Sequence, residues 1–242
     1  MRDYEKEIEA RADWVRGILR DSGAKGIVYG NSGGKDCTLV SAICKRATDN
    51  VIGVIMPCHS RQNYGSDRDD ALRAAEKFGI ECITVDLSDT KDALCAAIEK
   101  SLKVTDPAGT NINPRLRMTV LYAVAQSKGY LVAGTGNRSE GYMGYFTKWG
   151  DGAYDLNPIS DLTVTEIYEF LRYLGAPEHI ITKAPSAGLF DGQTDEGEMG
   201  VTYAEIDSLL LTGETSESAK PIIERRHAMS EHKRSGPHVY EK

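Results

Sequence analysis

The chain has 242 residues, of which 40% are hydrophobic and 27% charged, and its formal net charge is −7. This length and composition predict one ordinary globular α/β domain with a full core, spanning residues 1–242. The negative charge argues against a protein that wraps nucleic acid or lies on an anionic membrane, and no apolar run approaches the roughly 18 residues of a membrane helix. Local positive groups must therefore hold any anionic substrate.

Cysteine usage and the N-terminal segment both favour a cytoplasmic protein. The five cysteines are odd in number and show no CxxC spacing. This pattern is typical of buried thiols in a reducing cytosol and not of a disulfide framework. Residues 1–23 are charged and carry apolar side chains at helical spacing, which predicts a helix instead of a signal peptide.

Strand-like and helix-like segments alternate along the rest of the chain. Apolar runs predict strands at 26–30, 51–57, 81–87 and 130–137. Helical spacing predicts helices within 31–48, after a glycine-rich turn, and at 69–79, 89–102, 114–129, 163–175, 202–211 and 219–229. The alternation predicts an α/β fold of three layers, in which helices cover both faces of a mainly parallel, twisted sheet. A polar Pro/Gly stretch (106–114) and a long irregular segment (183–200) interrupt the pattern; segments as long as the second tend to be lids, binding loops or disordered.

A glycine-rich turn joins the first predicted strand to the following helix. Its adjacent glycines let backbone N–H groups turn toward one point, where the start of the helix adds unpaired donors and a partial positive charge. Two glycines alone indicate only a tight turn, but the serine before them and the Lys-Asp pair after them favour a phosphate site. Because a carboxylate at Asp36 would repel phosphate, we expect magnesium to bridge Asp36 and a polyphosphate. The predicted ATP-binding residues of this turn are Gly30, Asn31, Ser32, Gly33, Gly34, Lys35, Asp36 and Cys37.

The turn matches neither GxxxxGK[ST] nor GxGxxG. Its SGGxD pattern resembles the pyrophosphate loop of the N-type ATP pyrophosphatase superfamily, whose members adenylate a substrate oxygen with ATP. The segment GTGNRSEGYMGYFTKWGDGAYDLNPISDLT (134–163) resembles the signature of the ammonia-dependent NAD synthetase (NAD synthase) family. Segments 183–207 and 230–234 resemble that family's mobile loop and late His-Lys element. The resemblance covers nearly the whole chain and implies an adenine nucleotide alpha-hydrolase-like fold.

The resemblance also implies an activity and its reactants. ATP, as co-substrate, adenylates the nicotinate carboxylate of deamido-NAD and releases pyrophosphate, and ammonia then displaces AMP to give NAD. Magnesium is the implied cofactor, and a homodimer with the dinucleotide site at its interface is the implied assembly. The synthetase pattern leaves no room for a glutaminase domain, so we expect ammonia from solution or from a separate, unknown donor.

By resemblance, Glu140 is the second magnesium ligand beside Asp36, and Thr135 contacts ATP. Both follow the fourth predicted strand, at the sheet edge where ligands of open α/β folds bind. Outside this motif, Glu140 would be interpreted as a solvated loop carboxylate.

The resemblance assigns deamido-NAD to five residues, which are Arg115, Lys148, Asp155, His232 and Lys233. Chemistry alone does not separate Arg115 from Arg117, and the spacing to Thr135 favours Arg115. Without the motif, His-Lys-Arg near the C-terminus would be interpreted as a solvated charge cluster.

Asp151 is our candidate for the group that takes a proton from ammonium, because it is the carboxylate flanked by glycines in the signature. The alternative is that Asp151 only positions Lys148. An unchanged pH profile of activity in Asp151→Asn would exclude the role as a base.

Three positions depart from the family pattern. Cys37 replaces a serine or threonine, which should weaken one phosphate contact, and Ser186 replaces an ATP-binding threonine but keeps the hydroxyl. Val164 stands where we expect an ATP-binding lysine, and Lys183 is one candidate to supply the missing cation. These departures leave open a nucleotide-binding module without turnover, and a related ligase that amidates another carboxylate is a further alternative.

Overall fold

The computed structural model describes residues 2–59, 64–183 and 194–240. Its strands are β1 (Ile27–Gly30), β2 (Val51–Ile55), β3 (Glu81–Thr84) and β4 (Leu131–Ala133). Its helices are α1 (Tyr4–Ser22), α2 (Lys35–Ala47), α4 (Ser66–Phe78), α5 (Ser88–Glu99), α6 (Asp106–Lys128), α7 (Arg138–Met143), α8 (Val164–Tyr173), α9 (Glu178–Thr182), α10 (Asp195–Met199), α11 (Tyr203–Thr212), α12 (Ala219–Met229) and α13 (Glu231–Arg234).

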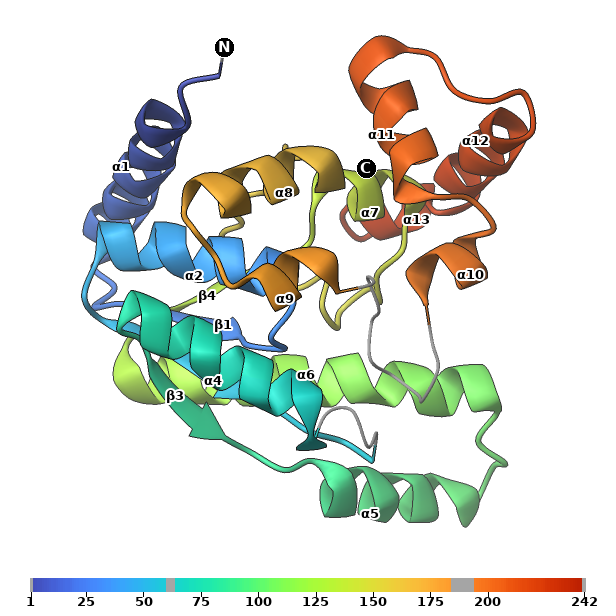
Figure 1. The fold of residues 1–242 in the computed structure, drawn as a ribbon. Helices are drawn as coiled ribbons and strands as arrows, with labels where there is room; N and C mark the ends of the chain where they lie inside the picture. Colours follow the sequence, from blue (N-terminus) through green and yellow to red (C-terminus); the bar gives the residue numbers. More distant parts are fainter. Residues whose placement is uncertain (1, 60–63, 184–193, 241–242) are drawn as a thin grey trace.

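The four strands form one parallel sheet in the order β3-β2-β1-β4. Successive side chains of β1 enter opposite cores: Ile27 and Tyr29 pack with α1, α2 and α8, whereas Val28 packs with α6. Figure 1 shows α2 with α1 and α8 on one side of the sheet and α6 on the other. The predicted three-layer α/β fold with a parallel sheet is therefore confirmed.

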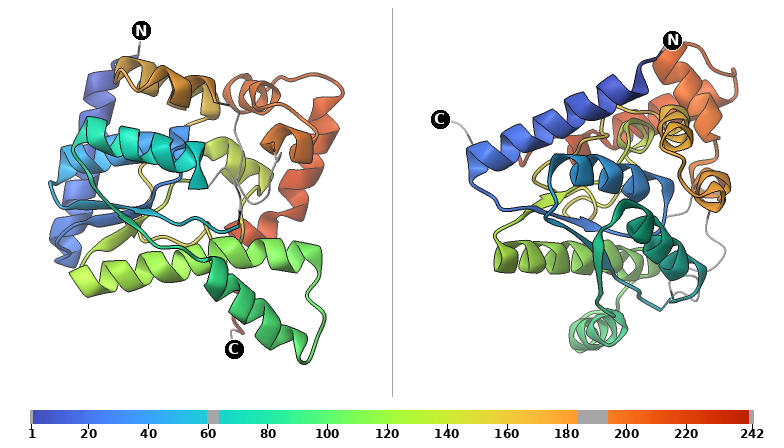
Figure 2. Two further views of the ribbon diagram at one scale, coloured as in Figure 1. Left: turned by 60° about the horizontal axis from the view of Figure 1, so that its bottom comes forward. Right: turned by 60° about the vertical axis from the view of Figure 1, so that its left-hand side comes forward.

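A third apolar cluster joins the C-terminal helices to the middle of the chain. Met143 of α7 and Val164 of α8 pack there against Ile206 of α11 and Ile223 of α12. Figure 2 shows these C-terminal helices gathered to one side of the sheet layers. Within the described ranges, none of the helices combines the length and the apolarity needed to cross a membrane.

The helix expected at 114–129 begins earlier, at Asp106, so the expectation of an irregular stretch at 106–114 was wrong. Pro107 lies in the first turn of α6. Backbone N–H groups there have no acceptor within the helix, so proline removes no helical hydrogen bond. Pro114 lies inside the helix, where it removes one backbone hydrogen bond, but it is buried together with Asn113. Packing at this position outweighs the local preference of proline for a turn.

Two short helices lie in segments that the sequence predicted to be irregular. α7 occupies the glycine-rich region after β4, and it begins with a capping box in which Asn137 and Glu140 bond each other's backbone N–H groups. α10 occupies the end of the segment 183–200, of which residues 184–193 lie outside the described residues. Both helices are five or six residues long, too short for hydrophobic periodicity to reveal them.

Candidate nucleotide site at the carboxyl edge of the sheet

The glycine-rich turn between β1 and α2 has the geometry of an anion site. Gly34 is the N-cap of α2 and provides no side-chain cap, so the first N–H groups of this 13-residue helix keep their donor capacity. Asn31 is buried and fixes the turn, because its Nδ2 donates to Ala71 O (3.0 Å) and its Oδ1 accepts from Gly33 N (3.3 Å). Ser32 is exposed at the mouth of the turn.

Gly33 is required for close packing of the turn on α4. Its φ is +73°, and a Cβ at this position would lie 2.5 Å from Asp67 O and 2.7 Å from Ala71 N. A side chain would therefore meet both a strained backbone and two backbone atoms of α4. The first turn of α4 consequently lies directly against this glycine-rich turn between β1 and α2, which we call the phosphate turn.

The structure brings Asp36 and Glu140 to one place, although 104 positions separate them in sequence. Asn137 joins them: its Nδ2 donates to Asp36 Oδ1 (3.0 Å), and its backbone N donates to Glu140 Oε2 (3.0 Å). The buried ammonium of Lys35 donates to Asp36 Oδ2 (2.8 Å). Asn137 is a residue that our sequence analysis missed, and the Asn-x-x-Glu capping pattern was the signal that could have indicated it.

The pKa values in this cluster reflect crowded negative charge. Burial and the neighbouring Asp36 carboxylate raise the pKa of Glu140 well above its ordinary value. Burial lowers the pKa of Lys35, but the carboxylates of Asp36 and Glu140 outweigh that effect and raise it. A second cation between the two carboxylates would relieve their repulsion.

The chemistry of this pair fits magnesium, which binds to one or two carboxylates and completes its shell with water and phosphate oxygens. Among the described residues, no group of three or more His, Cys, Asp or Glu side chains could hold a metal ion. Further ligands would therefore have to come from the nucleotide or from water.

Cys37 lies beneath Ser32, with 3.5 Å between its Sγ and Ser32 Oγ. Its side chain is buried, and its thiol donates to Gly34 O (3.2 Å). Burial raises the pKa of this thiol, so the uncharged form is favoured.

Val164 lies in the apolar cluster of α7, α11 and α12 and provides no cation. Lys183 lies nearer to the phosphate turn, because its Nζ contacts Asp67 and Asp70 of α4, each at 2.7 Å. Ser186 lies outside the described residues. Thr135 is half-buried, two residues beyond β4, and its contact with ATP stays a prediction.

A second group brings together four of the five predicted dinucleotide contacts. Arg115 Nη2 donates to Lys148 O (3.3 Å), Lys148 Nζ donates to His232 O, and Lys233 Nζ donates to Gly144 O (2.8 Å) and Phe146 O (2.7 Å). Within the described parts of the chain, none of these three cations forms an ion pair. Backbone carbonyls hold the cations together, which leaves their charges available to an anionic ligand.

Asp151 lies in the same region. Its Oδ1 accepts from Thr147 N (2.9 Å), and Thr147 Oγ1 donates to Asn111 Oδ1 (2.6 Å) on α6. Burial of the carboxylate raises the pKa of Asp151, although this hydrogen bond and the charges of Arg117 and Lys233 oppose the rise. A carboxyl group with a raised pKa is suited to proton transfer.

The structure separates Arg115 from Arg117, which the sequence could not do by chemistry. Arg115 contacts the Lys148 segment, whereas Arg117 Nε donates to Met56 O (3.3 Å) beyond β2. Burial lowers the pKa of Arg117, and the charges of Asp151 and Asp67 are among the effects that oppose this. Arg117 therefore balances the charge of Asp151, and Arg115 belongs to the group of cations with Lys148 and Lys233.

Asp155 has structural partners of its own. Its Oδ2 accepts from Val132 N (2.8 Å) in β4, and its Oδ1 accepts from Tyr122 OH (3.2 Å) in α6. These bonds fix the chain as it returns beside β4, where Leu156 pairs with Ala133. Contact of Asp155 with deamido-NAD stays a prediction.

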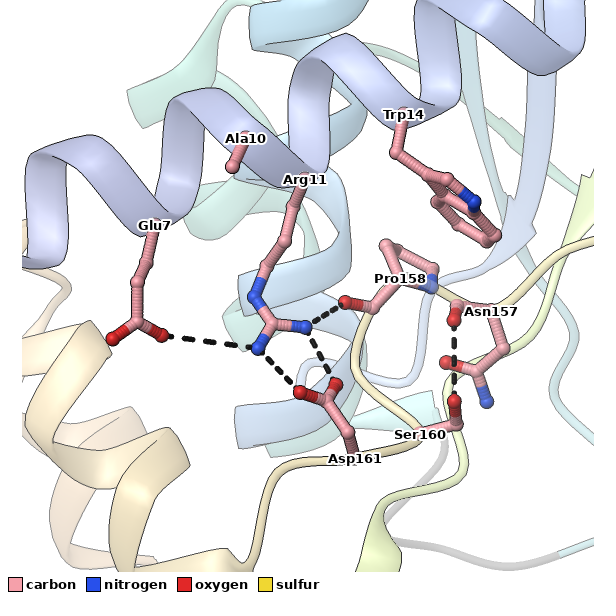
Figure 3. A pocket seen from close by; sticks show the side chains of 8 residues that line it. All are labelled: Glu7, Ala10, Arg11, Trp14, Asn157, Pro158, Ser160 and Asp161. Atoms are coloured by element: carbon pink, nitrogen blue, oxygen red, sulfur yellow. Dashed lines mark hydrogen bonds and ion pairs between the residues drawn. The ribbon is translucent and has the colours of Figure 1, made fainter.

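A pocket of about 400 Å³ lies elsewhere, between α1 and residues 157–161 (Figure 3). Arg11 points into it but is already paired with Asp161 (2.6 and 2.7 Å) and with Pro158 O (2.7 Å). Because its positive charge is neutralised there, this pocket does not have the character of a polyphosphate site.

A helix-start phosphate turn, an adjacent pair of carboxylates and a separate group of cations define an enzyme that uses a nucleoside triphosphate on an anionic substrate. The chain belongs to the NAD synthase family, whose pattern matches residues 7–240. It is 47% identical to the NH(3)-dependent NAD(+) synthetase of Carboxydothermus hydrogenoformans over 98% of both chains. The protein is accordingly a carbon–nitrogen ligase, as the sequence predicted.

Solved structures agree with this assignment. An NMN synthetase from Francisella tularensis superimposes with a TM-score of 0.94 at 35% identity, over the whole of both chains. An NH3-dependent NAD synthetase from Campylobacter jejuni superimposes with a TM-score of 0.81 at 30% identity, again over the whole of both chains.

Proposed function

We propose that the protein makes NAD from deamido-NAD, ATP and ammonia, with magnesium bound by Asp36 and Glu140. The observation that carries the proposal is the joining of these two carboxylates by Asn137 at the N-terminus of α2. A polyphosphate at this helix start would lie beside both carboxylates, and a divalent cation between them would neutralise the charge of the leaving pyrophosphate.

The residues of the chain supply binding and orientation for two chemical steps. The nicotinate carboxylate attacks the α-phosphorus of ATP, while the N–H groups of residues 35–37, in the first turn of α2, hold the departing pyrophosphate. Arg115, Lys148 and Lys233 hold the anionic groups of the nicotinate nucleotide. Ammonia then attacks the acyl carbon, and AMP leaves.

Asp151 takes the proton that ammonium must lose in this second step. Its carboxylate has a raised pKa and lies near Lys233, within the group of cations assigned to the substrate. Replacement by asparagine keeps an acceptor for Thr147 N but removes the base. The pH dependence of activity on ammonium then decides between the base and a purely positioning role: an unchanged profile supports positioning of Lys148.

The test of the activity is to incubate the protein with ATP, magnesium, deamido-NAD and an ammonium salt, and to measure NAD, AMP and pyrophosphate together. Equal amounts of all three support the proposal. Formation of AMP without NAD would mean that the phosphate turn is active on another acid, and no AMP at high ammonium would refute the proposal.

A second candidate substrate is nicotinate mononucleotide, which lacks the adenylate half of deamido-NAD. The observation that favours it is the TM-score of 0.94 to an NMN synthetase. The two candidates share the pyridinium carboxylate and one phosphate, so the same cations serve both. Comparison of kcat/KM for the two nucleotides at saturating ATP and ammonium separates them.

We also propose that the protein is a homodimer that associates through α5 and the adjoining surface of α6. None of the residues of α5 is buried. Two leucines in this region are exposed to solvent: Leu94 of α5 is 38% exposed, and Leu102, which follows α5, is 69% exposed. Figure 2 shows α5 projecting from the body of the protein next to α6. Sedimentation of Leu94→Lys, with Leu211→Lys on α11 as a control of similar exposure, tests this: only the first change should yield monomers.

A further inference from the structure

Trp149 has a backbone conformation that is unusual for a bulky residue. Its φ is +61°, and His59 is the only other non-glycine residue with a positive φ in the described ranges. The conformation is unfavourable for a residue with a Cβ, and it persists where surrounding structure imposes it. Here Gly150 N and Gly152 N both donate to Thr147 O, at 2.9 and 3.2 Å, which closes a tight turn around Trp149.

This strained turn holds the indole at the surface and not in the core. The side chain of Trp149 is 52% exposed. The next residue, Gly150, packs against Pro114 of α6, where an added Cβ would lie 3.0 Å from Pro114 Cβ. The turn is thus anchored on α6 at one side and presents a large aromatic ring to solvent at the other, an arrangement that favours ligand binding over core packing.

The groups beside the ring are those that hold an anionic nucleotide in our proposal. Lys148 Nζ lies 5.4 Å from the centroid of the Trp149 ring. Arg115 donates to Lys148 O, and Lys148 donates to His232 O. The electron-rich face of the indole therefore already accepts one cation, and it lies next to charges suited to phosphate.

We infer that Trp149 binds the positively charged pyridinium ring of the nicotinate nucleotide by stacking, an inference that rests on the proposed function. A nicotinate nucleotide carries a cationic ring and an anionic phosphate a few bonds apart. The indole face attracts the ring through its quadrupole, and Lys148 and Arg115 attract the phosphate. An adenine ring has no positive charge, so the cation–π attraction selects the pyridinium end of the substrate.

The chain allows a direct optical test, because Trp14 and Trp149 are its only tryptophans. Trp14 lines the pocket between α1 and residues 157–161. In Trp14→Phe, all tryptophan fluorescence comes from Trp149. Titration of this variant with nicotinate mononucleotide, without ATP, should give saturable quenching after correction for absorption by the ligand. Trp149→Phe, which keeps Trp14, is the matched control and should show none.

AMP and inorganic phosphate distinguish the parts of the ligand. At equal saturation, neither should quench the fluorescence of Trp149 as strongly as nicotinate mononucleotide does, because neither contains a pyridinium ring. The inference is overturned if AMP quenches Trp149 and the mononucleotide does not, or if the mononucleotide quenches both single-tryptophan proteins equally.

Kinetics give a second, independent measurement. Trp149→Leu should raise KM for the nicotinate nucleotide about five- to tenfold and leave KM for ATP unchanged, whereas Trp149→Phe should recover most of the loss. If the protein makes NAD and Trp149→Leu keeps the wild-type KM for the nicotinate nucleotide, the stacking is refuted and the proposed function stands. Quenching of Trp149 by the mononucleotide in a protein that makes no NAD would refute the proposed function and leave the stacking intact.

Discussion

Replacement of Gly33 by alanine should destabilise the protein through two separate effects. An alanine at φ +73° costs about 1–2 kcal/mol. Its Cβ would also lie 2.5 Å from Asp67 O and 2.7 Å from Ala71 N, and such overpacking costs about 1–3 kcal/mol. We therefore expect the free energy of unfolding to fall by about 2–5 kcal/mol, a large part of the roughly 5–15 kcal/mol typical of a folded domain.

Urea unfolding without nucleotide measures this loss, and Gly34→Ala is the matched control. Gly34 has an ordinary φ of −85°, and a Cβ there would meet only the rotatable Ser32 hydroxyl, at 3.3 Å. We expect Gly34→Ala to lower the free energy of unfolding by less than about 1 kcal/mol, the usual scale for an N-cap change. Equal losses in the two variants would refute the packing of the phosphate turn on α4.

Three further changes test the site. Because desolvation raises the pKa of Asp151, the protonated form stabilises the fold at low pH, and this stability is lost as pH rises through the folded-state pKa. Asp151→Asn should therefore gain stability over wild type from pH 4 to pH 8, by less than about 1 kcal/mol because water screens this exposed residue; paired urea titrations measure the gain. Asn137→Ala removes both the cap of α7 and the bond to Asp36, and it should lower the free energy of unfolding by about 1–3 kcal/mol. Asn137→Ser keeps a side-chain cap without the amide bond to Asp36 and should lower it less; equal losses in the two variants would mean that the cap contributes little. Lys183→Met should raise KM for ATP; an unchanged KM would exclude Lys183 as the substitute for the missing lysine. The same change should lower the free energy of unfolding by about 1–3 kcal/mol, because it removes the cation shared by the largely buried carboxylates of Asp67 and Asp70.

The sequence could predict the elements whose signals are local. The strand, glycine-rich turn and helix at β1 and α2 lie where the apolar run and the following helical spacing place them. The strand expected at 130–137 overlaps β4, but β4 ends at Ala133, which forms an isolated bridge with Leu156. That end depends on a partner distant in sequence, which a single apolar run does not reveal.

The start of α6 is where local preference misled the sequence analysis. Proline and glycine at 106–114 favour a turn, but Asn113 and Pro114 are buried against other elements, and Asn111 donates to Pro107 O (2.9 Å). This early start of α6 matters for the candidate site, because the helix carries both Arg115 and Asn111, which accepts a hydrogen bond from Thr147. A stretch that was expected to be irregular therefore supports residues that we propose to bind the substrate.

Charge balance unites the features of the phosphate turn. Asp36 and Glu140 bring two carboxylates to a helix start that favours anions, and Lys35 supplies one compensating ammonium. With both carboxylates ionised, the cluster carries net negative charge and would repel a polyphosphate. The raised pKa of Glu140 is the sign of this imbalance in the free protein, and a divalent cation that enters with the nucleotide would remove it. In our proposal ATP and the metal bind there together, which makes Asp36 compatible with the phosphate turn.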